Sequence, residues 1–399
     1  MEIVKIKMIV FSDSTKKLIL NCIRYAFNYG SSIDIDKDFN CVEFYRLCLQ
    51  HSVSVIVFET LKDFKEELPE NFYNALKQKA QKDIIKDIWG SYDVETVISA
   101  FENNGIRFIP LKGYYLKKLY PKPEMRYATD YDILIDNADI DKVHTVAKQL
   151  GMKLDAIGDH HDIFYCPETK TVFEFHKNIF EGKLNKAFGN GFNRAKLKEG
   201  YKYFYELPPE DFYISILGHS AYHFAHGGGV GIRHVLDVYL YKKAYQFNEE
   251  YLKKELEKCG LTEFREQFEK LADYLFADGE GDGFTEKLAD YVLDSSIFGN
   301  EDKKQASDIV ANTADDNDRS AKIKTLTKLI FPPFKTMKGY YPILKKLPIL
   351  LPFCYIARWF TVLIKRPKSL KKIKKITNAS EQDLSEIKTI RDKLGLKNL

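Results

Sequence analysis

Residues 107–135 read RFIPLKGYYLKKLYPKPEMRYATDYDILI, and the end of this stretch decides the fold. Asp130 and Asp132 stand at alternate positions and lead into the apolar segment Ile133–Ile135. Alternate residues of a strand share a face and lie roughly 6.6 Å apart, at about 3.3 Å per residue. Two carboxylates on one face suit a hard cation such as Mg²⁺, because burying them without positive charge is costly. The pattern predicts a magnesium site; the simpler interpretation is a strand end with two solvated acids.

Lys112 and Gly113 follow a first apolar segment, Ile106–Leu111, and precede a short amphipathic run that Pro121 ends. A glycine at a helix start lets backbone amides approach a phosphate group, and the lysine adds a full positive charge. The pair is therefore predicted to bind phosphate. The alternative is an ordinary turn between a strand and a helix.

A third acid lies in Thr171–His176, where polar and aromatic residues alternate as in a strand. Glu174 and His176 fall on one face, and the phenylalanines fall on the other. A third carboxylate on a neighbouring strand is what two-metal chemistry requires, because one acid pair holds the ions while the remaining acid orients or deprotonates an attacking hydroxyl. The alternative is that Glu174 pairs with a Lys or Arg across the sheet.

Together these residues resemble the nucleotidyltransferase superfamily with the DNA polymerase β-like fold, and most closely an uncharacterised bacterial branch of it. That branch has Leu-Lys-Gly, then Arg, then Asp-x-Asp before apolar residues, then Glu-x-His. The corresponding residues here are Leu111-Lys112-Gly113, Arg126, Asp130 with Asp132, and Glu174 with His176. The resemblance covers residues 105–180 well and 219–237 more loosely.

The resemblance implies an α+β fold, with a small mixed β-sheet flanked by N-terminal and C-terminal helical regions. It implies that Asp130, Asp132 and Glu174 are catalytic and bind Mg²⁺, as two ions. The implied reaction moves a nucleoside monophosphate from a nucleoside triphosphate to an acceptor hydroxyl, with release of pyrophosphate. The acceptor leaves no mark in the sequence.

The resemblance also assigns residues to the nucleotide. Lys112 and Gly113 would bind it where the superfamily usually has a Gly-Ser pair, so the serine hydroxyl is missing here. Arg126 would clamp phosphate, because a guanidinium presents paired donors. His176 would contact substrate.

Composition limits the other classes of function. The chain has 399 residues and a net charge of only +4, so general binding of nucleic acid is not expected, although the positive charge concentrates after Lys322. The six cysteines form no Cys-x-x-Cys motif, and the N-terminus lacks the pattern of a signal peptide. We therefore expect a cytoplasmic protein.

Periodicity and turn residues predict three regions: an N-terminal helical domain at 1–104, an α/β core at 105–207 and a C-terminal helical domain with a basic amphipathic tail at 208–399. The resemblance implies that the region at 105–207 is the nucleotidyltransferase core. The Met1–Val10 segment is expected to form the first element. The expected helices and strands are helices at Lys16–Tyr29, Val42–Leu61, Pro69–Phe101 and Asp139–Leu150, and strands at Ile106–Leu111, Lys153–Ile157, Ile163–Cys166, Thr171–His176 and Tyr201–Leu207.

A helix that runs to His226 is expected after the boundary at Pro208-Pro209, with His219, His223 and His226 on one face and three glycines after it. Three histidines in this register could bind zinc, which would make the protein a metal-dependent hydrolase. No acidic or cysteine ligand stands at the usual short spacing. In the nucleotidyltransferase interpretation, this helix faces the cleft and His223 contacts substrate.

Arg233 and Asp237 lie one turn apart in the next expected helix. The structural interpretation is an exposed i,i+4 ion pair, worth a few tenths of a kcal/mol. The functional interpretation is a partly buried pair in which Asp237 holds Arg233 toward substrate.

Two acidic segments, at 278–283 and 315–318, are expected to be loops, since neither has the ligand set of a calcium-binding loop. The tail at 343–375 is apolar, aromatic and rich in lysine, but prolines and Arg358 interrupt it. It either packs on the core or docks peripherally on anionic lipid. The second option favours a different class of function, a non-catalytic nucleotide-binding or membrane-peripheral accessory protein of surface-polysaccharide assembly.

Overall fold

The computed structural model describes residues 11–27, 33–35, 39–277, 279–297, 299, 301–310, 318–365, 373, 376–377 and 380–399. The expected first element at Met1–Val10, residues 315–317 of the second acidic segment and most of 366–375 lie outside the described residues. The chain divides into two compact units: one at 1–221, 230–297 and 398–399, the other at 222–229 and 298–397. The three-domain division stays a prediction.

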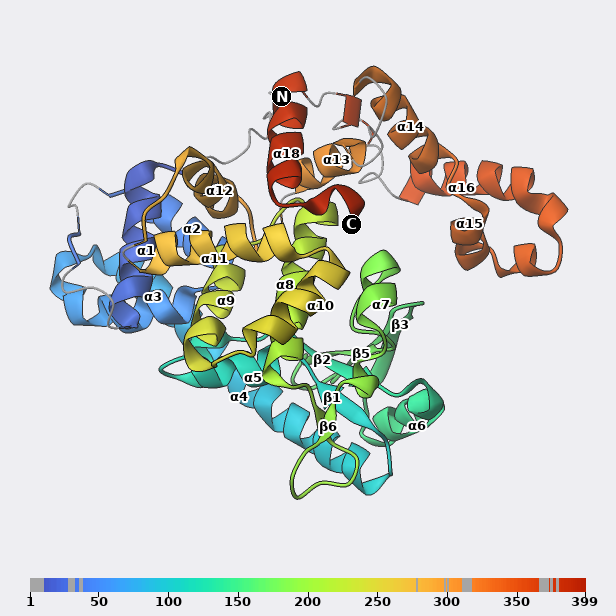
Figure 1. Ribbon diagram of the computed structural model, residues 1–399, viewed down its shortest axis with the longest axis horizontal. Helices are drawn as coiled ribbons and strands as arrows, with labels where there is room; N and C mark the ends of the chain where they lie inside the picture. Colours follow the sequence, from blue (N-terminus) through green and yellow to red (C-terminus); the bar gives the residue numbers. More distant parts are fainter. Residues whose placement is uncertain are drawn as a thin grey trace. The chain divides into compact units, whose positions relative to one another are not determined.

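The first unit contains a sheet whose described strands have the order β1-β2-β5-β4-β3 (Figure 1). Its strands are β1 (Phe108–Pro110), β2 (Asp130–Ile135), β3 (Lys153–Ile157), β4 (His161–Tyr165) and β5 (Val172–His176). β2 and β5 pair in parallel, and the other neighbours pair antiparallel. The sheet is therefore small and mixed. Helices come before it and after it in the sequence. The predicted α+β fold class is confirmed.

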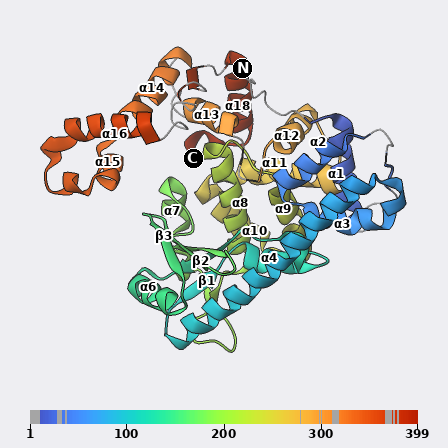
Figure 2. The same ribbon diagram turned by 180° about the vertical axis from the view of Figure 1, so that it is seen from behind.

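The pleat of β2 separates its apolar residues from its acids. Tyr131, Ile133 and Ile135 belong to a buried cluster with residues of α4 (Glu70–Asn103) and α6 (Ile140–Gln149). Since successive side chains of a strand point to opposite faces, Asp130 and Asp132 lie on the other face. Burial against these two helices (Figure 2) thus fixes which face of the sheet receives the carboxylates.

Aromatic side chains fill this core. Phe101, Phe108, Phe173 and Phe175 are fully buried, and the rings of Phe101 and Phe175 have centroids 5.5 Å apart. Such offset contacts stabilise a core beyond the burial of area alone. The alternation read in Thr171–His176 therefore has a direct cause, since the phenylalanines of β5 enter the core and leave Glu174 and His176 on the opposite face.

The N-terminal helices of the first unit are α1 (Asp13–Ala26), α2 (Cys41–His51), α3 (Ser54–Leu61) and α4. The predicted single helix at Val42–Leu61 is wrong, because Ser52 adopts a left-handed conformation with φ 54° and ends α2. Its N–H donates to Leu49 O at 3.2 Å, and Val53 N–H donates to Cys48 O at 3.1 Å. This is the Schellman pattern, in which two hydrogen bonds satisfy carbonyls at a helix end. The apolar spacing continues across the break, so periodicity alone does not reveal it.

The remaining elements of the first unit are α5 (Gly113–Leu116), α7 (Gly182–Phe188), β6 (Lys196–Leu197), β7 (Tyr205–Glu206), α8 (Pro209–His226, whose end enters the second unit), α9 (Ile232–Ala244), α10 (Glu249–Cys259), α11 (Thr262–Phe276) and α12 (Gly283–Leu293). The predicted end of α8 at His226 is confirmed. The described part of the first acidic segment, 279–282, is a loop as predicted. Asp282 caps α12, accepting from the N–H groups of Phe284 and Thr285.

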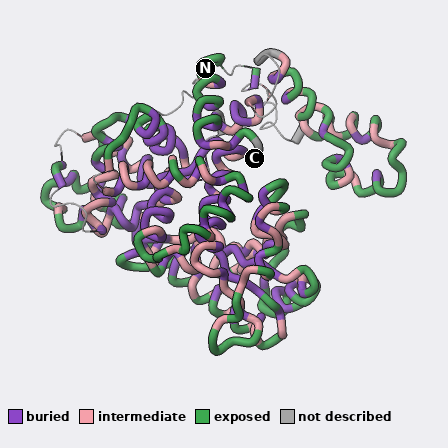
Figure 3. The backbone as a smooth tube through the Cα atoms, in the orientation of Figure 1, coloured by how far each residue is buried: buried purple, intermediate pink, exposed green. Residues whose placement is uncertain are grey.

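The second unit contains α13 (Glu301–Val310), α14 (Asp318–Ile330), α15 (Phe334–Tyr340), α16 (Leu351–Lys365) and α18 (Glu381–Lys393). Met337, Leu344 and Cys354 form a small buried cluster among them. Many positions along α14, α15 and α16 are exposed (Figure 3). Within the part of the chain that is described, every helix is too short or too polar to cross a lipid bilayer.

Gly90 of α4 provides a test of how tightly this helix packs on β2. A Cβ atom at Gly90 would lie 2.8 Å from Tyr131 Cε2. Alanine favours a helix by about 1 kcal/mol over glycine, but overpacking costs about 1–3 kcal/mol. We expect Gly90→Ala to lower the melting temperature in thermal denaturation. In the control Gly283→Ala, where the Cβ meets nothing within 4 Å, we expect no loss; equal losses in both variants would contradict the packing.

Candidate functional site

Two of the predicted acids meet across the parallel strand pair at the centre of the sheet. Asp132 of β2 lies directly opposite Glu174 of β5, and Asp130 lies opposite Val172. Asp132 is 8% exposed, and the Glu174 side chain is 23% exposed. The ligand atoms of Asp132, Glu174 and His176 all lie within 4.8 Å of one another. Asp130 lies two residues before Asp132 on β2, on the same face of the sheet.

Asp132 has a positively charged or donating partner at each oxygen. His176 Nε2 lies 2.8 Å from Oδ1, and Lys112 Nζ lies 3.2 Å from Oδ2. Burial alone would favour the neutral acid, but Lys112 and His176 outweigh it and hold the pKa of Asp132 well below its usual range. Asp132 is therefore a fixed negative charge at the centre of the site.

His176 links the two strands electrostatically. Its Nε2 also lies 3.3 Å from Glu174 Oε2. Burial lowers the pKa of His176, but its bonds to Asp132 and Glu174 raise the pKa above the usual value. The same bond to His176 overcomes burial at Glu174 and lowers the pKa of that carboxyl. Both acids thus remain ionised and oriented.

Asp130 behaves differently from the other two acids. Burial and the nearby charge of Asp132 raise its pKa, and the charge of Lys112 and a hydrogen bond from Thr129 Oγ1 at 3.1 Å only partly oppose them. Asp132 and Glu174 bring two negative charges into one small volume beside His176, and Asp130 feels the charge of both. The donor set of two carboxylates and one imidazole therefore fits a divalent cation.

The segment predicted to bind phosphate has an unusual backbone. Lys112 has φ 34° and ψ −103°, a left-handed conformation that is strained for a residue with a Cβ. The helix after it, α5, has only four residues and passes into a 3₁₀ turn at Lys117–Leu119. The expected helix dipole at Gly113 is therefore weak, because a single turn aligns few peptide units. The short helix expected before Pro121 is present, and the contribution of its dipole to phosphate binding stays a prediction.

Gly113 serves a close approach between two segments. A Cβ at this position would lie 2.9 Å from Arg126 Nη1. The glycine thus makes room for a buried guanidinium, and the Lys112-Gly113 turn lies against Arg126. Their predicted roles in binding nucleotide remain predictions.

Arg126 forms a buried, two-pronged ion pair with Asp237 of α9. Its Nε donates to Oδ1 at 2.7 Å and its Nη2 donates to Oδ2 at 2.7 Å. Tyr120 adds a hydrogen bond from its hydroxyl to Oδ1 at 2.8 Å. Burial lowers the pKa of Arg126, but Asp237 outweighs it and the net shift is upward. The pair ties the connection before β2 to α9.

The predicted partnership of Arg233 and Asp237 is wrong. Both side chains are buried, and Arg233 Nη1 donates to the backbone carbonyl of Tyr127 at 2.7 Å. Among the residues described, the ion-pair partner of Asp237 is Arg126. Packing between distant segments decides the partner. Asp237 is buried on α9, and the fold brings the guanidinium of Arg126 to it.

His223 lies on α8 within the second compact unit, whereas the acids lie in the first. Its neighbour His219 stacks on His234, with ring centroids 5.7 Å apart and planes at 14°. In the described ranges, the groups of side chains that could hold a metal ion are both at the sheet, and neither includes a histidine of α8. The zinc hydrolase alternative therefore gains no support.

Two histidines at the site escaped the sequence-based prediction. His160 and His161 stand at the start of β4, and His161 is opposite His176 in the antiparallel register with β5. His160 Nε2 lies 3.3 Å from His176 Nδ1. Burial, followed by the charges of His176 and His161, lowers the pKa of His160 to about 4. The signal was the adjacent pair itself, followed by alternating apolar residues.

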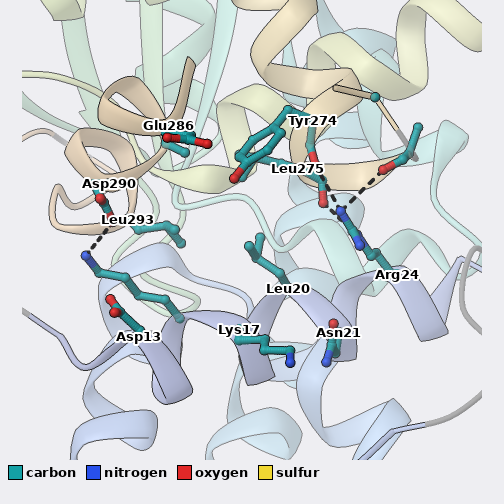
Figure 4. Close-up of a pocket in the computed structure, with 14 residues that line it drawn as sticks. Asp13, Lys17, Leu20, Asn21, Arg24, Tyr274, Leu275, Glu286, Asp290 and Leu293 are labelled. Atoms are coloured by element: carbon teal, nitrogen blue, oxygen red, sulfur yellow. Dashed lines mark hydrogen bonds and ion pairs between the residues drawn. The ribbon is translucent and has the colours of Figure 1, made fainter. Parts of the chain in front are cut away.

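A surface hollow of about 710 Å³ lies away from these residues, between α1 and the α11–α12 segment (Figure 4). Lys16, Asp290 and Arg24 in its lining have structural partners. Lys16 Nζ bonds to Asp290 at 2.9 Å, and Arg24 donates to the carbonyls of Leu275 at 2.8 Å and Tyr274 at 3.0 Å. The hollow thus lies between helices, and Asp130, Asp132 and Glu174 are not among the residues that line it.

Comparison with known families supports the interpretation of the sheet. Residues 37–277 match the family model described as uncharacterised nucleotidyltransferase, which spans more than half of the chain. The protein belongs to this family. The match contains all five strands, the acids and α9. It supports a transferase of nucleotidyl groups as the general class. Searches of curated proteins and of solved structures gave no match.

The buried pair of Arg126 and Asp237 predicts a large loss of stability. Asp237→Ala leaves the guanidinium buried without its partner, which typically costs about 3–5 kcal/mol. Chemical denaturation should show this loss. The control is Lys62→Ala, because Lys62 is exposed and Glu59 keeps Lys122 as a partner. We expect less than about 0.5 kcal/mol there. Similar small losses in both variants would contradict the geometry.

Proposed function

We propose that this protein transfers a nucleoside monophosphate from a nucleoside triphosphate to an acceptor hydroxyl, using Mg²⁺ and releasing pyrophosphate. The observation that carries the proposal is the pairing of Asp132 with Glu174 on adjacent parallel strands. The family assignment agrees with it. Asp130, Asp132 and Glu174 are the proposed ligands of the metal, and two ions are expected.

In this proposal Asp132 and Glu174 hold a permanent negative charge, because His176 and Lys112 keep them ionised. Bound Mg²⁺ would supply positive charge to the triphosphate and make the acceptor hydroxyl more acidic. The acceptor oxygen forms a bond to the α-phosphorus, and the bond from that phosphorus to the bridging oxygen breaks. Pyrophosphate leaves with the electron pair, and the acceptor proton passes to a carboxylate or to solvent.

The phosphate side of the site is proposed around the Lys112-Gly113 turn. Arg126 uses Nε and Nη2 for Asp237, while its Nη1 points at Gly113. A guanidinium has five N–H donors, so Nη1 can still donate. Asp237 is then a positioning residue that holds Arg126 beside the turn. This arrangement supports a phosphate grip without the serine of the usual Gly-Ser pair.

Fewer contacts define the part of the site that would bind the acceptor than define the part around the Lys112-Gly113 turn. The sequence predicts that His176, His223 and Arg233 bind substrate, and we keep this as a proposal for each residue by itself, since His223 belongs to the other compact unit. His176 is the best supported of the three, since it already contacts two of the acids. Arg233 is buried and bonded to a backbone carbonyl, which favours a supporting role in the same site.

Substitution of the central acid tests the proposal. Asp132→Asn removes charge but not volume, so Mg²⁺-dependent release of pyrophosphate from nucleoside triphosphates should fall by about 100-fold or more. Circular dichroism checks that the variant is folded. The control is Asp155→Asn on the exposed strand β3, which should keep wild-type turnover. Wild-type turnover in folded Asp132→Asn would overturn the assignment.

A second candidate function concerns the basic arm, which we define as residues 319–380. It contains 16 Lys and Arg residues and no Asp or Glu, whereas the rest of the chain has 45 Lys and Arg against 57 Asp and Glu. Ile349, Phe353 and Phe360 are 81%, 67% and 62% exposed on it. Apolar side chains among cations suit the surface of an anionic bilayer.

Polar contacts hold the described part of the basic arm together and leave these apolar side chains outside. Trp359 Nε1 donates to Ile330 O at 2.9 Å, and Tyr355 hydroxyl donates to Pro332 O at 2.6 Å. We propose that the arm docks peripherally on anionic lipid, at a site within 343–375. A protein that binds nucleotide and membrane but releases no pyrophosphate would instead be an accessory protein, such as one of surface-polysaccharide assembly.

Vesicle binding tests the docking surface. The full-length protein should co-sediment with phosphatidylcholine vesicles that contain phosphatidylglycerol, and salt should weaken the binding. Each lysine near the surface contributes about 1 kcal/mol, so Lys345→Gln with Lys346→Gln should weaken binding about 25-fold. Phe353→Ser should also weaken it. Ile88→Ser, an exposed position on α4, should not. Binding that ignores salt and all of these changes would sink the proposal.

A further inference from the structure

We propose that His160, His161 and His176 form a second metal site, for a divalent transition ion such as Zn²⁺, beside the carboxylates that are proposed to bind Mg²⁺. The inference goes beyond nucleotidyl transfer and does not depend on it. It rests on the positions of three imidazoles, on the hydrogen bonds behind them and on a buried nitrogen without a partner.

The antiparallel pairing of β4 and β5 brings the three rings together. His161 lies opposite His176, and His160 directly precedes the paired segment. The ring centroid of His176 is 4.9 Å from that of His160 and 5.0 Å from that of His161. One nitrogen of each ring lies within 4.8 Å of a nitrogen of the other two. Three imidazoles thus converge on one small volume.

The spacing of two of these nitrogens matches a metal site. His160 Nε2 and His176 Nδ1 are 3.3 Å apart. With zinc–nitrogen bonds of about 2.0–2.1 Å in tetrahedral geometry, two ligand nitrogens stand about 3.3–3.4 Å apart. Two lone pairs cannot face each other at this distance unless a proton or a cation lies between them. Either one proton or one metal ion can therefore lie between His160 Nε2 and His176 Nδ1.

The hydrogen bonds on the far side of His176 select the correct nitrogen for a metal. Its Nε2 bonds to Asp132 Oδ1 at 2.8 Å, so Nδ1 is the nitrogen that faces His160 and that a metal ion would bind in place of a proton. Metal-binding histidines usually donate their other N–H to a carboxylate in this way, because the contact fixes the tautomer and the ring. Glu174 Oε2 lies 3.8 Å from His161 Nε2, within ion-pair distance but beyond hydrogen-bond distance.

His161 supplies an independent observation. Its Nδ1 is buried and has no hydrogen-bond partner among the described residues. A buried polar atom without a partner costs free energy, so such an atom in a native protein calls for an explanation. Coordination of an ion by this ring would remove the cost.

The donor set determines which ions fit. Three neutral imidazoles favour zinc, cobalt, nickel or copper, whereas Mg²⁺ takes oxygen ligands and keeps several waters. Three protein ligands leave a fourth position for an external group, as in open zinc sites. His176 belongs to both groups, so an ion at the histidines would contact the same ring that orients Asp132. We place the transition ion at the histidines and Mg²⁺ at the carboxylates.

Cobalt and zinc titrations of the full-length protein test the site. In excess Mg²⁺, one equivalent of Co²⁺ should give the intense visible absorption of four-coordinate cobalt, and Zn²⁺ should displace it. His160→Gln and His161→Gln should each weaken Zn²⁺ binding by about 100-fold or more in calorimetry, since each removes a ligand. Zn²⁺ should raise the melting temperature of the wild type but not of the two variants.

Two controls separate this site from the others. His144→Gln removes a histidine of α6 that bonds to Asp162, outside the group of three, and should keep full Zn²⁺ affinity. Asp130→Asn should also keep Zn²⁺ binding while losing release of pyrophosphate, so failure of one proposal is distinguishable from failure of the other. The metal site is overturned if the wild type binds no ion, or if His160→Gln and His161→Gln bind Zn²⁺ as the wild type does. Either result would leave a hydrogen-bonded cluster of imidazoles only.

Discussion

The charge balance around Asp132 is the constraint on which the rest of the site depends. A carboxylate that is 8% exposed is stable as an ion only with partners, and Lys112 and His176 provide them. These partners come from the turn after β1 and from β5. Lys112 makes its contact with Asp132 from a turn in which its own backbone is strained. Electrostatics and the path of the chain are thus coupled at one residue.

The central strand β5 connects the two groups of potential ligands. On one side it pairs in parallel with β2, which sets Glu174 against Asp132. On the other side it pairs with β4, which sets His176 against His161. Because the β3–β4 hairpin is inserted in sequence between β2 and β5, residues far apart in the chain share one face. A five-stranded sheet therefore holds both oxygen-rich and nitrogen-rich ligand sets within one small region.

Local patterns were sufficient to predict the elements that carry the acids. Alternation located β2, β3 and β5, and glycine and proline located the ends of α6 and α8. The helix break at Ser52 was missed, because apolar spacing continues through it and only the backbone conformation reveals it. A sequence pattern thus predicts that a segment is helical or extended more reliably than it predicts where a helix is broken.

Partnerships over long separations could not be predicted in this way. Asp237 was assigned to Arg233, its neighbour on the helix, but it binds Arg126, 111 residues away. The histidine pair at the start of β4 is visible in the sequence as two adjacent histidines, but its significance depends on the register with β5. In both cases the side chains meet only after the sheet and the helices have packed. Which acids share a face is local information, whereas which cations reach them is not.

The most direct measurement is the position of a bound cation. Crystals grown with Mn²⁺ and a nucleoside triphosphate whose α,β-bridge resists cleavage would show manganese by its anomalous scattering. The account predicts a peak in contact with carboxylate oxygens of Asp132 and Glu174, with the triphosphate beside Lys112. A well-occupied triphosphate and manganese bound elsewhere, with Asp132 still bonded only to Lys112 and His176, would contradict it.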